Sequence, residues 1–194
     1  MKEMVIGLDQ SYTDTGLCIA IDGIPKYAES VSFDGADDKS DKRSKLSERL
    51  RLIIDKFKGK YIITIVLEAV RLFSGSQPHI STSYIFSTCA MIGMFVDIAN
   101  EYGVDIYWVE TRSWKKHVLG SSKPSGRKLK GVKDPKKVDS VLYACSIGFK
   151  DKIAYKVERG KNKGQIRYND NIADAICIAI AGFSKKIRKN LKNF

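Results

Sequence analysis

Three carboxylates stand in segments where apolar side chains would be expected. Asp9 ends the first apolar run of the chain, and Glu68 follows the β-branched run of residues 61–67. Asp174 interrupts residues 172–183, the longest apolar stretch. A buried acid is unfavourable unless a cation, a hydrogen-bond donor or a metal compensates its charge. These three positions are therefore candidates for chemistry.

Acids that gather without histidines predict a particular kind of metal site. The chain has only two histidines, His79 and His117, so a histidine-rich centre is not expected. Three or four converging carboxylates form a hard oxygen site that suits Mg²⁺ or Mn²⁺. Two such ions about 3.5–4 Å apart are the usual apparatus for hydrolysing a phosphodiester bond. For any single acid the alternative stays open that it caps the turn after its strand.

The elements that must position these acids follow from the spacing of the apolar residues. Strands are predicted at residues 4–8, 16–21, 27–33, 61–67 and 104–109. Helices are predicted at residues 40–57, 81–102, 111–120, 134–147 and from about 170 onward. Strands that alternate with helices after a run of three antiparallel strands indicate a mixed α/β sheet with helices on its faces. A helix packed on this sheet can bring Asp174 beside the ends of the strands that carry Asp9 and Glu68.

The basic residues are concentrated in two segments. The 194-residue chain has a formal net charge of +12. Residues 112–137 hold ten Lys or Arg and one Asp, and the tail at residues 185–194 adds five more and no acid. The rest of the chain is close to neutral, a pattern that favours a polyanionic partner such as nucleic acid. The alternative is a basic surface that serves solubility alone.

Several classes of protein are not expected from this sequence. The N-terminus lacks the apolar length of a signal peptide, and the stretch around Asp174 is too short to span a bilayer. The four cysteines lie far apart without a CxxC pair, which favours buried thiols in the cytoplasm. We therefore expect one α/β domain over residues 1–194, with basic loops near 121–133 and 150–168 and the basic tail 185–194.

Several short segments, taken in order, resemble the motifs of the RuvC-type Holliday-junction resolvases of the RNase H-like superfamily. They are Ile6-Gly7-Leu8-Asp9, Thr15-Gly16-Leu17-Cys18-Ile19, Val66-Leu67-Glu68, Ala90-Met91-Ile92-Gly93, the run from Ser113 to Gly120, Lys136-Lys137-Val138, and Asp170-Asn171-Ile172-Ala173-Asp174-Ala175. The resemblance implies an RNase H-like fold, with a five-stranded mixed sheet of three antiparallel strands followed by two parallel ones. Its divergence and small size suggest a bacteriophage member.

The resemblance also implies roles for single residues. Asp9, Glu68 and Asp174 match the metal-binding carboxylates of the family. The family's fourth acid lies three residues before the last one, where this chain has Asn171. Asp170 is adjacent and shares a helix face with Asp174, so either residue is a candidate ligand, with a helix N-cap as the alternative for Asp170.

Lysines and one aromatic residue complete the set that the resemblance implies. Lys115 matches one catalytic lysine of the family, and either Lys136 or Lys137 matches the other. Phe73 is the candidate for the aromatic residue that wedges into a junction, although it comes later after Glu68 than the family pattern. The candidate DNA-binding residues are Phe73, Arg112, Lys115, Lys116, Lys123, Arg127, Lys128, Lys136 and Lys137.

The function that the resemblance implies is a Mg²⁺- or Mn²⁺-dependent endonuclease that nicks Holliday junctions and other branched DNA. It would leave 5′-phosphate and 3′-hydroxyl ends. The two-fold symmetry of a four-way junction favours a homodimer, with residues 81–102 as the candidate interface. Two alternatives stay open. The first is a branched-DNA-binding protein with weakened catalysis, which is considered because Asn171 stands where the family has an acid. The second is an RNase H-like nuclease acting on RNA or on duplex ends.

Overall fold

A six-stranded mixed sheet forms the centre of the protein. The computed structural model describes residues 1–11, 14–32, 39–69 and 82–191. The strands lie in the order β3-β2-β1-β4-β5-β8. Their bounds are β1 Lys2–Asp9, β2 Asp14–Ile21, β3 Ile24–Ser32, β4 Tyr61–Glu68, β5 Asp105–Val109 and β8 Arg188–Asn190.

The first five strands confirm the predicted topology. β1 pairs with β2, and β2 with β3, in antiparallel fashion. β1 and β4 run parallel, and so do β4 and β5. Because parallel neighbours end at the same edge of a sheet, the last residues of β1 and β4 meet there. That edge is where the sequence places Asp9 and Glu68.

The sixth strand, which lies within the basic tail 185–194, corrects the predicted number of five strands. β8 pairs antiparallel with β5, and the backbone N–H of Leu191 donates to the carbonyl of Ile106 at 3.1 Å. Lys189 also forms an ion pair with Glu110 at 2.9 Å. Three mainly basic residues carry no apolar alternation, so pattern reasoning could not identify them as a strand.

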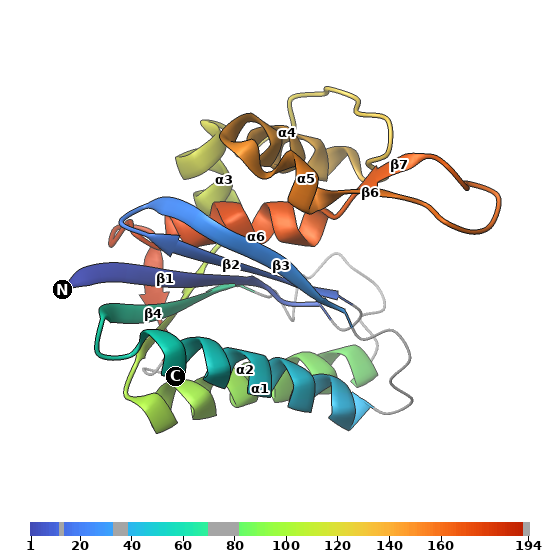
Figure 1. Cartoon of the computed structure of the whole chain (residues 1–194). Helices are drawn as coiled ribbons and strands as arrows, with labels where there is room; N and C mark the ends of the chain where they lie inside the picture. The colour runs from blue at the N-terminus through green and yellow to red at the C-terminus, as the bar shows by residue number, and fades with distance from the viewer. Residues whose placement is uncertain (12–13, 33–38, 70–81, 192–194) are drawn as a thin grey trace.

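Helices cover both faces of the sheet (Figure 1). α1 (Lys39–Phe57) and α2 (Thr82–Tyr102) lie on one face, where Leu46, Leu50 and Phe95 belong to the first apolar core. α6 (Asp170–Ala181) covers the other face, and α3 (Thr111–Leu119) and α4 (Val138–Ala144) pack against α6. α6 is buried along nearly its whole length, as its apolar composition predicts.

Two glycines let α6 lie directly against the strands. A Cβ atom at Gly7 would be 2.5 Å from the backbone nitrogen of Ala179, and one at Gly16 would be 2.0 Å from the carbonyl oxygen of Asn171. Real Cβ atoms do not approach backbone this closely, so only glycine fits at either position. The α6 backbone is therefore held close to β1 and β2.

The segment after α3 is an extended connection followed by an interrupted helix. The side chain of Asp134 caps this helix by accepting from the backbone N–H of Lys136 at 2.8 Å, as the Asp-Pro sequence predicts. The first turn is a 3₁₀ helix, η1 (Pro135–Lys137), which α4 continues. A kink at η2 (Cys145–Phe149), where Gly148 has φ +91°, leads to α5 (Lys150–Ile153).

The basic segment at residues 150–168, where a basic loop is predicted, contains a β-hairpin. β6 (Ala154–Lys156) pairs antiparallel with β7 (Ile166–Tyr168) in a separate two-stranded sheet. In Figure 1 the hairpin extends away from the helices that cover the main sheet. Its polypeptide leads directly into α6.

Cysteine chemistry plays no visible part in this architecture. All four cysteines are free thiols, and Cys18 of β2 and Cys177 of α6 are buried in the same apolar core. Burial raises the pKa of both thiols, which favours the neutral, unreactive form. None of the helices within the described ranges is both long enough and apolar enough to cross a lipid bilayer.

Candidate active site

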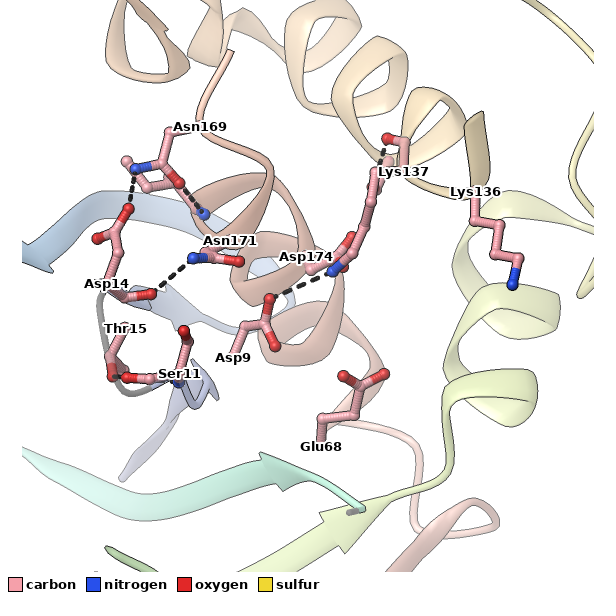
Figure 2. A network of polar contacts seen from close by, with 12 residues as sticks. Asp9, Ser11, Asp14, Thr15, Glu68, Lys136, Lys137, Asn169, Asn171 and Asp174 are labelled. Atoms are coloured by element: carbon pink, nitrogen blue, oxygen red, sulfur yellow. Dashed lines mark hydrogen bonds and ion pairs between the residues drawn. The ribbon is translucent and has the colours of Figure 1, made fainter. Parts of the chain in front are cut away.

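The three carboxylates singled out from the sequence converge at one edge of the main sheet (Figure 2). Asp9 is the last residue of β1, Glu68 is the last residue of β4, and Asp174 lies in α6. Asp9 lies near enough to the other two that their charges raise its pKa. Parallel pairing brings Asp9 and Glu68 together, and the glycine contacts beneath α6 bring in Asp174.

Asp9 and Asp174 are nearly removed from solvent. The exposed fraction is 6% for Asp9 and 1% for Asp174. Burial is the largest influence on both groups, and it raises the pKa of each carboxyl above its usual value. Neighbouring negative charge raises them further, so the two ionised groups need a cation beside them.

Lys137 supplies that cation in the structure. Its Nζ lies 3.5 Å from Oδ2 of Asp9 and also donates a hydrogen bond to Oδ2 of Asp174 (Figure 2). Burial acts to lower the pKa of Lys137, but attraction to Asp174 and Asp9 outweighs it and the pKa is raised. Lys137 therefore stays protonated and bridges the two aspartates.

The neighbouring Lys136 takes a different direction. Its side chain is exposed and lies beside that of Lys115 along a pocket that also contains Arg112. Lys115 donates a hydrogen bond of 3.0 Å to the backbone carbonyl of Lys136, which joins α3 to η1. Of the two lysines between which the sequence could not choose, Lys137 thus faces the carboxylates and Lys136 faces a basic pocket.

Two residues that sequence reasoning did not place in the site hold Glu68. Trp114, which is fully buried, donates its indole N–H to Oε1 of Glu68 at 2.9 Å. The side-chain amide of Gln10 donates to the backbone carbonyl of Glu68 at 2.5 Å. The sequence around Trp114, with Arg112 before it and Lys115 and Lys116 after it, carries no signal that the indole N–H reaches a carboxylate.

We expect Trp114→Phe to impair the site through Glu68. The substitution keeps an aromatic ring and removes the N–H, so one oxygen of Glu68 loses its donor. A hydrogen bond to a charged group is worth roughly 1.5–3 kcal/mol, which predicts at least a tenfold slower metal-dependent cleavage. Trp108→Phe, which removes an indole from β5, is the matched control. Equal cleavage rates for the two variants would contradict a positioning role for Trp114.

The arrangement fits a hard divalent cation. Oδ1 of Asp174 is buried and accepts no well-formed hydrogen bond among the described residues, because the nearby Ser140 hydroxyl, which acts to lower the pKa of this carboxyl, donates to the backbone carbonyl of Lys137. An orphaned carboxylate oxygen beside two further carboxylates is the donor chemistry that Mg²⁺ and Mn²⁺ prefer. No three acidic, cysteine or histidine side chains in the described ranges are grouped closely enough to form a ready-made metal cage. By the chemistry of their oxygens, Asp9, Glu68 and Asp174 are the residues that would hold a metal, and Lys137 contacts the two aspartates in its place.

The two candidates for a fourth ligand have other partners or surroundings. The side-chain amide of Asn171 donates to the backbone carbonyl of Asp14 at 2.6 Å (Figure 2). Asp170 lines a separate pocket with Lys152 and Tyr155. The N-cap of α6 is Asn169, which accepts from the backbone N–H of Ile172 at 3.1 Å, so the capping role considered for Asp170 belongs to its neighbour.

We expect Asn171→Asp to destabilise the protein instead of improving a metal site. The new carboxylate would face the carbonyl of Asp14 that the amide now bonds, which costs about 2 kcal/mol. The favourable helix dipole at the start of α6 offsets only about 0.5 kcal/mol of this. Urea unfolding should show the loss, with Asn100→Asp on exposed α2 surface as control. Tighter Mg²⁺ binding at unchanged stability would instead identify residue 171 as a ligand position.

The remaining candidate DNA-binding residues lie around the basic pocket. Lys116, Lys123, Arg127 and Lys128 are exposed. Lys123 and Arg127 line a second pocket, between α3 and α4, whose wall includes Tyr143. Because Ala69 belongs to the first pocket, this basic surface begins directly beside Glu68. Phe73, the candidate wedge, lies outside the described residues.

Comparisons with known proteins identify the fold. No protein-family model matches the sequence, and no curated protein matches it either. The chain resembles the structure of Thermus thermophilus RuvC with a TM-score of 0.63 and 16% identity, covering 97% of this chain and 99% of that one. It also resembles T. thermophilus RuvC in complex with Holliday junction substrate, with a TM-score of 0.64, 14% identity and the same coverage. At these identities the likeness shows the fold, and it confirms the predicted RNase H-like class.

Proposed function

We propose that this protein is a metal-dependent endonuclease that cuts branched DNA, above all four-way junctions. The observation that carries the proposal is the Asp9–Glu68–Asp174 cluster, in which both aspartates are buried, next to a basic pocket that begins at Ala69. Carboxylates that can bind a divalent metal ion lie beside basic side chains that can bind phosphates. This combination is typical of enzymes that hydrolyse phosphodiester bonds. The fold shared with a RuvC that was solved with Holliday junction substrate supports branched DNA as the substrate.

The residues around the cluster would divide the work. A bound divalent cation would supply Lewis acidity for the attack of water on the phosphorus, leaving a 5′-phosphate and a 3′-hydroxyl. Asp9, Glu68 and Asp174 hold the cation, while Trp114 fixes the orientation of Glu68. Arg112, Lys115 and Lys136 would orient the DNA backbone along the pocket beside Ala69. Lys137 would stabilise the negative charge that develops on the phosphate.

A homodimer would match the symmetry of the substrate. Two identical active sites related by a two-fold axis could make paired nicks in a four-way junction. The candidate interface is α2, whose first turns expose the aromatic side chains of Tyr84 and Phe86. Sedimentation of the protein with and without junction DNA would test this assembly. The bacteriophage origin and the cytoplasmic location stay predictions.

Incubation with synthetic substrates tests the function directly. A four-way junction, a fork, a linear duplex and an RNA–DNA hybrid of matched length are compared in Mg²⁺, in Mn²⁺ and in EDTA. We expect metal-dependent nicks in the junction that Asp9→Asn does not make. Tight junction binding without cleavage in either metal would favour the binding-protein alternative. Preference for the hybrid would favour the RNA-directed one.

A further inference from the structure

A third concentration of basic residues lies on the β6–β7 hairpin. Residues 154–167 hold five lysines or arginines against a single acid, Glu158. The cations are Lys156, Arg159, Lys161, Lys163 and Arg167. In Figure 1 the hairpin projects from the α6 side of the protein, beyond the end of the main sheet. It therefore presents its charge away from the rest of the molecule.

The charge of the hairpin is not neutralised by the protein itself. Across the described ranges, none of its five cations forms an ion pair with a carboxylate, whereas Lys137 and Lys189 in other elements do. A two-stranded hairpin is only marginally stable alone, and repulsion between like charges weakens it further. A projecting element of this kind gains stability when it meets a polyanion.

The hairpin is nevertheless firmly joined to the body at its base. The backbone N–H of Asn169 donates to the carbonyl of Ile153 at 2.7 Å, and the side chain of Ile153 is buried. Gly131, with φ +98°, lies so close to β7 that a Cβ there would be 2.3 Å from the carbonyl oxygen of Ile166. The basic loop at residues 121–133 therefore packs against the hairpin, and the two share one surface.

The geometry fixes how far the hairpin reaches from the carboxylates. β7 leads through Asn169 into α6, and Asp174 lies about 6 Å along the helix axis from Asp170 at 1.5 Å per residue. From β6 to the turn near Gly160 the hairpin is about 20 Å long, at roughly 3.3 Å per residue. Its tip is thus about 25 Å from the cluster, or roughly seven base pairs of duplex at 3.4 Å each.

We propose that the β6–β7 hairpin binds the phosphate backbone of a duplex DNA arm about seven base pairs from the point of cleavage. The inference rests on the proposed function, because the arm enters through the site described above. The hairpin cations supply affinity and hold the arm, and they take no part in the chemistry at Asp9 and Asp174. Across the hairpin, Tyr155 pairs with Arg167 in register and is 50% exposed, which offers an aromatic contact beside the cations.

Removal of the tip charges tests the proposal. The variant carries Arg159→Gln, Lys161→Gln and Lys163→Gln, three exposed residues of the turn. The control carries Lys26→Gln, Lys56→Gln and Lys60→Gln, which remove the same charge at the opposite edge of the sheet, where β3 and β4 begin and α1 ends. Binding is measured in EDTA by fluorescence anisotropy on four-way junctions with arms of 5 and of 20 base pairs, over a series of salt concentrations.

The tip variant should bind the long-armed junction about tenfold more weakly at 0.15 M salt. The slope of log K against log salt should fall by roughly two to three, since each phosphate contact contributes about 0.9. On the short-armed junction, which ends before the tip, the tip variant and the control should bind alike. If the tip variant and the control bind the long-armed junction with equal affinities and equal salt slopes, the proposal is overturned. An acidic protein would then be the expected partner of the hairpin. Cleavage is measured in a separate assay. If the tip variant binds long arms more weakly but neither variant nor the unsubstituted protein cleaves the junction, the proposed nuclease function is refuted and the proposed hairpin contact is retained.

Discussion

We expect Asp174→Asn to abolish metal-dependent cleavage of a four-way junction while leaving the protein folded and able to bind the junction. The substitution keeps the shape of the side chain but removes the charge of the most buried acid in the cluster. The orphaned Oδ1 is then either an amide nitrogen or a neutral carbonyl oxygen, and neither replaces a carboxylate ligand to a hard cation. We expect a loss of about a thousandfold in rate, equal to roughly 4 kcal/mol in the barrier.

The measurement separates chemistry from binding and from folding. Single-turnover cleavage in Mg²⁺ gives the rate, anisotropy in EDTA gives junction affinity, and thermal melting reports the fold. Asp97→Asn on exposed α2 surface is the matched control, because it makes the same chemical change far from the cluster. Cleavage by Asp174→Asn within tenfold of the unsubstituted protein would refute the assignment of the site.

Lys137→Met should unfold more easily than any other single lysine variant near the site. Without the ammonium group, Asp9 and Asp174 are two buried negative charges with no compensating cation. Breaking a buried ion pair in this way costs roughly 3–5 kcal/mol. For a protein of this length a loss of 3 kcal/mol lowers Tm by about 10 °C. Lys136→Met removes the adjacent, exposed lysine and should change Tm little.

The direction of the pH dependence is fixed by the raised pKa values of the aspartates. In the folded variant Asp9 and Asp174 hold protons at pH values where the unfolded chain, with ordinary carboxyl groups near 3.8, has lost them. The folded state therefore binds more protons, so the stability of Lys137→Met rises as pH falls from 7 toward 5. Melting in EDTA across this range, beside Lys136→Met, provides the test. Equal and pH-independent melting of the two variants would show that Lys137 does not balance the aspartates.

Added Mg²⁺ provides a second, independent test of the role of Lys137, with the same Lys137→Met variant. A divalent cation can replace the missing ammonium group, whereas in the unsubstituted protein it must compete with Lys137. The rise in Tm with MgCl₂ should therefore be larger for Lys137→Met than for the unsubstituted protein. Ca²⁺ in place of Mg²⁺ should raise the Tm of Lys137→Met in the same way, because the rise depends on cation binding and not on cleavage.

The acids and most of the framework could be predicted from the sequence because their signals are local. Asp9, Glu68 and Asp174 stand out against apolar neighbours, and parallel pairing of their strands brings the first two to one edge. The first five strands and the main helices follow from periodicities of two and 3.6 residues. None of these inferences depends on which side chains, far apart in the sequence, contact each other in the fold.

The parts that could not be predicted depend on side-chain direction or on backbone pairing. Lys136 and Lys137 are adjacent residues of a single 3₁₀ turn, and only the three-dimensional structure shows which one turns toward Asp174. The N–H of Trp114 reaches Glu68 across two elements that are far apart in sequence. β8 forms because its backbone pairs with β5, and its side chains carry no pattern that predicts this pairing.

The glycines beneath α6 have a consequence for how the protein comes into being. Asp9 comes from the start of the chain and Asp174 from near its end, and they meet only where α6 lies against Gly7 and Gly16. Because Gly7 and Gly16 belong to two different strands, the surface that receives α6 is complete only where β1 and β2 are paired. The two aspartates therefore face each other only in a chain whose two ends have come together, and the candidate site is a property of the complete fold and of no single segment.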